Sequence, residues 1–273
     1  MLSGRHIAKL KAGSGARTMV DQTVLPWRLQ GGGCKFDILC PKYFAGMLKQ
    51  SLTGWQIEPV EGTVEICISL HKQNDDYVVD ARISEKVCRC DCLINALNEF
   101  LVFLAYSFQN QTDSGDLIHC AGFCEDQLNH IVVGPKNSGK STLAHDKAMA
   151  GLSVYADDLL FWNTKAGEFV ALGLPLRLRR PVVLSSGENA DPSNFFAGSV
   201  LAYSKVGVFD IAPIGSAFSL DRLWEMTLNH QLKPVSLLAT PKALQVFRIP
   251  KDFSTVKKQM YKFRPNETHA ASA

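Results

Sequence analysis

A short stretch of this sequence has the residue types that bind the phosphates of a nucleotide. Residues 134–142 (GPKNSGKST) fit the pattern G-x-x-x-x-G-K-[ST]. Gly134 and Gly139 leave room for backbone N–H groups to point inward at phosphate oxygens. Lys140 can reach the β- and γ-phosphates, and the Ser141 hydroxyl can ligate the Mg²⁺ that accompanies them. We predict a nucleotide-binding loop made of Gly134, Pro135, Lys136, Asn137, Ser138, Gly139, Lys140, Ser141 and Thr142.

The elements on either side of this loop suit the same role. Residues 129–133 (NHIVV) end in a β-branched run, which predicts a strand. Residues 141–150 (STLAHDKAMA) contain good helix formers, and a helix here would direct its positive N-terminal end at the phosphates. A chance Gly/Ser-rich turn would lack this strand-loop-helix context, so the context favours phosphate binding.

Two adjacent carboxylates follow the next predicted strand. Residues 151–156 (GLSVYA) form an apolar run that leads into Asp157 and Asp158. Neighbouring residues of a strand project in opposite directions, so we expect the two carboxylates to have different roles. One can face the Mg²⁺ and the γ-phosphate while the other anchors a neighbouring loop or the acceptor. A solvated pair of aspartates at a strand end is the alternative.

Three blocks of the sequence together resemble the C-terminal catalytic domain of HPr kinase/phosphorylase. They are Leu117-Ile118-His119, the loop at 134–141, and Ala156-Asp157-Asp158, in the order and with spacing similar to that family. The resemblance implies the P-loop fold shared with phosphoenolpyruvate carboxykinases. It also implies phosphoryl transfer from a nucleotide to a protein serine.

The resemblance assigns roles to several of these residues. It implies that Asp157 is the catalytic base and that His119 is the neighbour that orients or tunes this carboxylate. Lys140 is expected to neutralise charge during the transfer, while Ser141 and Asp158 hold Mg²⁺. Taken alone, His119 would more often be a core histidine with satisfied hydrogen bonds.

A group of arginines follows the acidic pair, in residues 173–181 (GLPLRLRRP). The Glu-Arg-Gly segment of the HPr kinase family has no match in this region, so phosphorylase activity is not implied. Guanidinium groups suit phosphate oxygens, and we expect Arg179, ahead of Arg177 and Arg180, to contact phosphate or the acceptor. A solvated strand edge is the alternative for all three arginines.

The composition limits the class of protein. The chain has 273 residues, which suits one or two domains, and 46% hydrophobic with 20% charged residues excludes a disordered or fibrous protein. A net charge of +3 gives no reason to expect nucleic acid as a partner. The eight cysteines are scattered and follow no secretory segment, so we expect reduced thiols and a cytoplasmic location. Residues 93–108 are apolar but shorter than a membrane span, which predicts a buried helix against a sheet and no membrane partner.

Three of the cysteines are close together at Cys88, Cys90 and Cys92. In a strand this spacing would place all three thiols on one face, as a soft metal requires. A fourth ligand at a typical spacing is absent from the sequence. We therefore expect three small, partly buried residues before a helix, with a zinc or redox site as the alternative.

Taken together, the sequence predicts an α/β protein with a P-loop kinase core resembling HPr kinase and phosphoenolpyruvate carboxykinase, preceded by a small α+β region. We expect a flexible arm at 1–30, the α+β region at 31–112, the catalytic domain at 113–265 and a disordered tail at 266–273. Within them we expect strands at 35–39, 63–70, 76–81, 205–211 and 216–220, helices at 42–52, 93–108, 221–228 and 241–247, and a loop over the active site at 181–192.

The expected function is ATP- and Mg²⁺-dependent transfer of the γ-phosphate to a serine or threonine hydroxyl of a protein or peptide. The identity of this acceptor does not follow from the sequence, and a homo-oligomer is left open. Two alternatives remain at this point. One is a regulatory module that binds the nucleotide without transferring phosphate, and the other is a kinase that acts on a small molecule.

Overall fold

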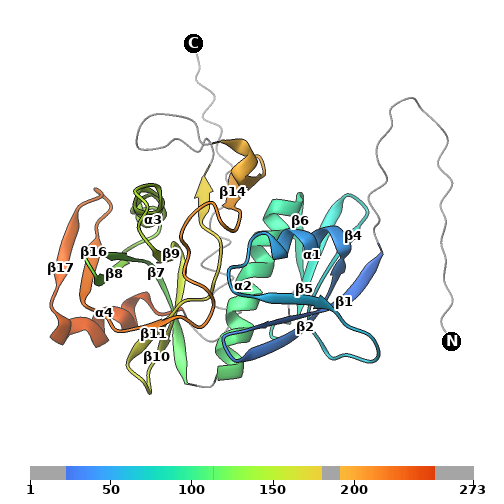
Figure 1. Cartoon of the computed structure of the whole chain (residues 1–273), viewed down its shortest axis with the longest axis horizontal. Helices are drawn as coiled ribbons and strands as arrows, with labels where there is room; N and C mark the ends of the chain where they lie inside the picture. The colour runs from blue at the N-terminus through green and yellow to red at the C-terminus, as the bar shows by residue number, and fades with distance from the viewer. Residues whose placement is uncertain (1–22, 86, 113, 180–190, 250–273) are drawn as a thin grey trace, which may run out of the picture.

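The computed structural model describes residues 23–85, 87–112, 114–179 and 191–249, and it is a mixed α/β structure. The chain forms two lobes, each built on a β-sheet, that meet along helix α2 (Figure 1). Residues 1–22 of the predicted arm at 1–30 lie outside the described residues, as do the residues from 250 onward, including the predicted tail.

The N-terminal lobe is a six-stranded sheet with two helices on one face. Alternate residues of its strands are buried, as Phe36, Ile38 and Cys40 are in β2, because only one face of the sheet is covered. Phe44 of α1 and Phe100 of α2 meet edge to face, with ring centroids 5.2 Å apart, beneath this sheet. In sheet order, the strands are β3 (Gln56–Pro59), β1 (Val24–Gly31), β2 (Cys34–Pro41), β4 (Ile66–Gln73), β5 (Asp76–Ala81) and β6 (Cys88–Cys90); the helices are α1 (Lys42–Lys49) and α2 (Leu93–Thr112).

The C-terminal lobe is organised around the long strand β7 (Gly115–Glu125), which pairs with three other strands. Helices α3 (Lys140–Met149) and α4 (Thr240–Phe247) pack against opposite faces of this sheet. Helix α3 shares an apolar cluster with Val132 of β8, and α4 shares another with Ile131 and Val133. The other strands of this sheet are β8 (Leu128–Val133), β9 (Val154–Ala156), β10 (Leu159–Asn163), β11 (Glu168–Val170), β15 (Ala217–Phe218), β16 (Arg222–Met226) and β17 (Leu232–Val235).

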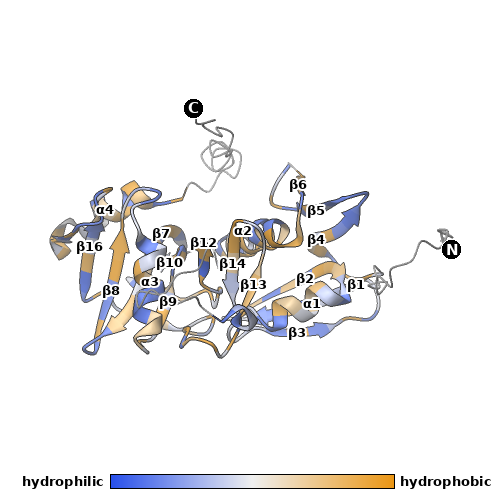
Figure 2. Ribbon diagram, turned by 90° about the horizontal axis from the view of Figure 1, so that it is seen from above, coloured by the Kyte–Doolittle hydropathy of each residue, from blue (hydrophilic) through white to orange (hydrophobic). Residues whose placement is uncertain are grey.

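A third, small sheet lies between the two lobes. It has the order β12 (Arg177–Arg179), β14 (Leu201–Ser204) and β13 (Phe195–Ala197). Figure 2 shows β12, β13 and β14 beside α2, with the larger sheets to either side. Short 3₁₀ turns precede β13 and α4, at Pro192–Asn194 and Leu237–Ala239.

The two lobes join through backbone contacts as well as side chains. The Thr53 N–H donates to the Gly173 carbonyl over 2.9 Å, and the Thr53 carbonyl accepts the Ile214 N–H over 3.0 Å. The Trp55 indole N–H donates to the Leu172 carbonyl over 2.9 Å. A side chain at Gly173 would collide with the Thr53 carbonyl, so glycine is needed for this close approach.

Most of the predicted elements are confirmed. The strand at 76–81 is β5, the strand at 35–39 lies within β2, and the strand at 63–70 corresponds to β4, displaced toward its C-terminal side. The predicted helices at 42–52, 93–108, 141–150 and 241–247 are α1, α2, α3 and α4, although α1 ends earlier.

Four predictions about elements were wrong. Residues 24–30 are not part of an arm but form most of β1, which pairs with both β2 and β3. The predicted strand at 205–211 is replaced by β14 upstream, because the chain turns at Gly207, where φ is +82°. The strand expected at 216–220 is reduced to the two residues of β15. The region expected at 31–112 therefore begins earlier, at Val24.

The fourth error concerns residues 221–228, which form strand β16 and not a helix. Asp221 is of a residue type common at helix N-caps, but its carboxylate accepts the backbone N–H of Asn129 over 2.8 Å. Strand β16 then pairs in parallel with β8, from Arg222 opposite His130 to Glu225 opposite Val133. Pairing with a distant strand thus overrides the local helix signal.

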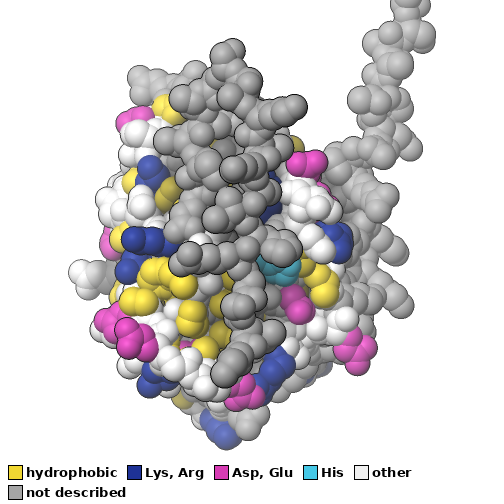
Figure 3. Space-filling model, turned by 90° about the vertical axis from the view of Figure 1, so that its right-hand side faces the viewer, with side chains coloured by type: hydrophobic (Ala, Val, Ile, Leu, Met, Phe, Trp, Pro, Cys, Tyr) yellow, Lys and Arg dark blue, Asp and Glu magenta, His cyan; other side chains and the backbone are white. Residues whose placement is uncertain are grey.

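Within the described part of the chain, no helix combines the length and the apolar character needed to cross a membrane. Figure 3 shows the outer end of the N-terminal lobe, where Lys and Arg side chains lie among Asp, Glu and hydrophobic ones. This mixture agrees with the small net charge of +3.

Candidate functional site

The predicted phosphate loop joins β8 to α3, with Gly139 at the position that caps the helix. Gly139 has a φ of +101° and Asn137 a φ of +67°, conformations that glycine and asparagine tolerate best. A side chain on Gly139 would lie 2.8 Å from the ring of His230, and one on Gly134 would collide with the Met226 carbonyl. Because these glycines carry no side chain, they leave room for the end of β16 and for the turn between β16 and β17.

Two polar groups are buried inside the loop. The Lys140 ammonium donates to the carbonyls of Gly134 and Pro135, over 2.9 and 3.0 Å, and burial lowers the pKa of Lys140. Ser138 is 0% exposed, and its Oγ has no hydrogen-bond partner within the described residues. Leaving such a hydroxyl unsatisfied costs about 1–3 kcal/mol, which an oxygen of a bound phosphate would offset.

The loop touches the acidic pair through Ser141. Its hydroxyl donates to the backbone carbonyl of Asp157 over 3.2 Å. Asp157 and Asp158 lie at the bend between β9 and β10, beside β7 in the centre of the sheet. The structure thus brings together two of the three sequence blocks through a direct contact.

Asp157 is buried, with 5% of its surface exposed. Its Oδ2 accepts the backbone N–H of Arg177 over 2.6 Å. Burial, and to a smaller extent the charge of Asp158, raise the pKa of Asp157 to about 7. This carboxyl can therefore gain and lose a proton near neutral pH.

Asp158 has the opposite electrostatic environment. Its Oδ1 lies 2.9 Å from Nη2 of Arg177 and 3.2 Å from Nε2 of His119. Burial alone would raise the pKa of Asp158, but Arg177, His119 and Lys140 together hold it well below its usual range. Both of these contacts are made by Oδ1.

The position of His119 differs from the prediction. We expected His119 beside Asp157, but it contacts Asp158. The reason is the antiparallel pairing of β7 with β10, in which His119 lies opposite Leu159 and the Cys120 N–H donates to the Asp158 carbonyl over 3.1 Å. The remaining sequence block, Leu117-Ile118-His119, therefore joins the site through the contact of His119 with Asp158.

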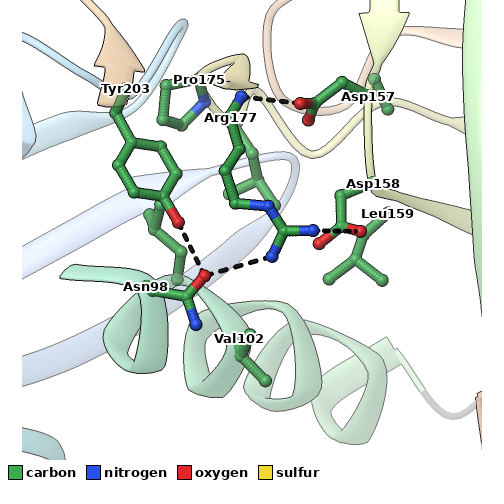
Figure 4. Close-up of a pocket in the computed structure, with 11 residues that line it drawn as sticks. Asn98, Val102, Asp157, Asp158, Leu159, Pro175, Arg177 and Tyr203 are labelled. Atoms are coloured by element: carbon green, nitrogen blue, oxygen red, sulfur yellow. Dashed lines mark hydrogen bonds and ion pairs between the residues drawn. The ribbon is translucent and has the colours of Figure 1, made fainter. Parts of the chain in front are cut away.

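Arg177 connects the acidic pair to the N-terminal lobe. Its Nη1 donates to Oδ1 of Asn98 on α2 over 3.2 Å, and the Tyr203 hydroxyl donates to the same oxygen over 2.7 Å (Figure 4). A cavity of about 20 Å³ lies among these residues, large enough for a water molecule. Asn98 and Tyr203 were missed by the sequence analysis. Polar Asn98 inside the apolar run of α2 was the signal that could have identified it.

Arg179 was expected to contact phosphate or the acceptor, ahead of Arg177. The backbone of Arg179 lies in β12, but its side chain is not among those described, and neither Arg180 nor most of the predicted covering loop is described. The arginine that contacts the acidic pair is Arg177.

The described residues include no group of three or more His, Cys, Asp or Glu side chains arranged to hold a metal ion. Cys88 and Cys90 are buried in β6, and burial raises the pKa of Cys90 to about 12, which keeps the thiol protonated. Mg²⁺ in phosphate-transfer sites needs only one or two protein oxygens, because the nucleotide supplies others. The Ser141 hydroxyl and the Asp158 carboxylate fit this requirement in chemical type.

No protein-family model matches this chain, and no curated protein matches it.

Proposed function

We propose that the protein is an ATP- and Mg²⁺-dependent kinase of the HPr-kinase-like type, which transfers the γ-phosphate to a serine or threonine hydroxyl of a protein or peptide. The observation that carries the proposal is the 3.2 Å contact between Ser141 and the Asp157 carbonyl. It joins a glycine-rich loop of phosphate-binding composition to the backbone of the residue whose carboxyl group has its pKa raised to about 7. Phosphoryl transfer depends on positioning and charge neutralisation, which this arrangement can supply.

Each residue has a role in the proposal that follows from its surroundings. The loop amides, Ser138 and Lys140 bind the phosphates, with the Lys140 ammonium leaving the loop carbonyls to reach them. Ser141 and Asp158 hold Mg²⁺, which when bound neutralises phosphate charge. A metal ligand must stay ionised at neutral pH, and the pKa of Asp158, held well below its usual range, meets this condition.

Asp157 is the proposed base that accepts the proton of the acceptor hydroxyl. A general base works best when its pKa lies near the working pH, and the pKa of Asp157 is raised to about 7. Arg177 and His119 are positioning residues in this proposal. They contact Asp158 and fix where its charge lies.

The test is transfer of labelled γ-phosphate from ATP with Mg²⁺, using the purified protein and an extract of its own host. Lys140→Ala and Asp157→Asn should each lower labelling by about 10² or more. Lys147→Ala is the matched control, because this lysine lies on the same helix but pairs with Glu125 over 2.5 Å. It should retain activity.

The products decide between the proposal and its alternatives. A labelled protein that disappears in both site variants supports the protein kinase and can be identified by mass spectrometry. Label in a metabolite would replace it with a small-molecule kinase. If the wild type binds ATP and labels nothing, the protein is a nucleotide-binding module and the proposed transfer is wrong.

A further inference from the structure

The turn between β16 and β17, residues 227–231, lies beside the phosphate loop. Strands β8 and β16 are parallel neighbours, with Val133 opposite Glu225 at their carboxyl ends. The phosphate loop follows β8, and the turn follows β16. In open α/β sheets, ligands bind outside the carboxyl ends of parallel strands. A ligand held by the loop would therefore have this turn as its neighbour.

Contacts fix the turn against the loop. Nδ1 of His230 lies 2.7 Å from the Ser138 carbonyl oxygen, and it must donate because a carbonyl can only accept. The His230 ring also occupies the space next to Gly139 that a side chain would fill, 2.8 Å away. At the other end of the loop, the Met226 carbonyl occupies the corresponding space at Gly134. The end of β16 and the turn that follows it therefore approach Gly134 and Gly139, the two glycines of the loop pattern.

The turn is internally ordered and presents side chains to solvent. The Thr227 N–H donates to the Gln231 carbonyl over 2.9 Å, and the His230 N–H donates to the Thr227 carbonyl over 3.0 Å. Leu228 is 64% exposed, although it is a large apolar residue, and Asn229 is exposed beside it. An apolar side chain and an amide together can cover a ring face and hydrogen-bond to ring-edge donors and acceptors.

We infer that the turn 227–231 is the nucleoside subsite, and that it contacts the base and ribose of the nucleotide whose phosphates occupy the loop. This inference rests on the proposed function, because it requires a nucleotide in the loop. Leu228 covers the ring face and Asn229 hydrogen-bonds to the ring edge. His230 is a positioning residue that holds the turn against Ser138.

The experiment separates the nucleoside from the phosphates. Calorimetric titration measures the affinities of the full chain for MgATP and for magnesium tripolyphosphate, which lacks base and ribose. The wild type should bind MgATP more tightly. Asn229→Ala and Leu228→Ser should each weaken MgATP about fivefold to tenfold and leave tripolyphosphate affinity unchanged. Leu238→Ser, at a residue 96% exposed outside the turn, is the control and should change neither affinity.

The outcomes distinguish two kinds of failure. If MgATP and tripolyphosphate bind equally well, or if both turn variants bind MgATP like the wild type, the nucleoside subsite is wrong while the phosphate loop stands. If the wild type binds neither ligand, the proposed function fails and the subsite fails with it. Both turn residues are exposed, so the variants should keep the wild-type melting temperature, which is measured alongside.

Discussion

At the scale of single residues, the central feature is that one arginine stabilises two neighbouring carboxylates in different ways. Arg177 donates its backbone N–H to Asp157 and its guanidinium to Asp158. The backbone bond leaves Asp157 without a full counter-charge, whereas the guanidinium supplies one to Asp158. Adjacent residues in the chain therefore acquire pKa values shifted in opposite directions.

The raised pKa of Asp157 predicts a dependence of stability on pH. Between the ordinary pKa of 3.8 and about 7, the folded protein binds a proton that the unfolded chain has lost. The stabilisation from this group is therefore complete below pH 4 and declines as the pH rises toward 7. Asp157→Asn, which can still accept the Arg177 N–H, should raise the free energy of unfolding at pH 8 by about 1–3 kcal/mol.

Asp158→Asn is the matched variant and should have the opposite effect. It removes the nearest counter-charge of the partly buried Arg177 guanidinium, which should lower the free energy of unfolding by about 1–3 kcal/mol at pH 8. Urea unfolding followed by tryptophan fluorescence at pH 5 and pH 8 measures both variants. A loss of stability in Asp157→Asn at pH 8 would contradict the assigned environment of Asp157.

The same pKa predicts how the proposed transfer depends on pH. Only ionised Asp157 can accept the proton of the acceptor hydroxyl, so the rate should rise about tenfold per pH unit below 7 and level off above it. Initial rates of phosphate transfer between pH 5.5 and 8.5 provide the measurement. A rate that is flat across this range would exclude Asp157 as the titrating base.

The residues of the site were predictable in part from the sequence. Lys140, Ser141, Asp157 and Asp158 were identified because each belongs to a short pattern with a known chemical purpose. Arg177 could not be chosen over Arg179, because the choice depends on which residue of β12 meets the bend after β9. Such contacts between segments distant in sequence are set by tertiary packing.

At the scale of elements, the sequence predicted those whose partners are nearby and missed those whose partners are distant. Helix α2 has an apolar pattern that defines it without further context. Strand β16 does not, since its parallel partner β8 lies about ninety residues earlier and its Asp221 resembles a helix cap. Strand β1 was missed for the same reason, because only its pairing with β2 and β3 shows it to be a strand.

Gly173, at the junction of the lobes, gives a prediction about how closely the two lobes approach each other. Gly173 and Gly167 both have positive φ, +63° and +72°, so alanine at either position costs about 1–2 kcal/mol of backbone strain. Alanine at Gly173 also collides with the Thr53 carbonyl, whereas nothing lies within 4 Å of the corresponding position at Gly167. Gly173→Ala should therefore destabilise the protein by at least about 2 kcal/mol more than Gly167→Ala.

Urea unfolding of the two variants measures this difference directly, because the strain term is common to both. Equal losses of stability would mean that the lobes do not approach each other at Gly173 as closely as the hydrogen bond from Thr53 requires.

At the scale of the whole molecule, the two lobes share one apolar core. The cluster that contains α2 and the N-terminal sheet also contains Leu117, Phe161 and Ile214 of the C-terminal lobe. Phe108 of α2 meets Phe161 of β10 with ring centroids 5.4 Å apart. The predicted boundary near residue 113 therefore marks a change of sheet within a continuous core. The hydrogen bonds from Arg177 and Tyr203 to Asn98 extend this connection into the site.

This shared core predicts how the molecule unfolds. Each lobe alone has the size of a small domain, so independent folding would give two separate thermal transitions. Separating the lobes would instead expose apolar side chains on both and leave the Trp55 and Thr53 hydrogen bonds unmade. Scanning calorimetry should therefore show one transition, with calorimetric and van't Hoff enthalpies in agreement. If MgATP binds at the loop, it should shift this single transition upward as a whole. Two resolved transitions, with only the later one responding to MgATP, would show that the N-terminal lobe folds without the site it contacts through Asn98.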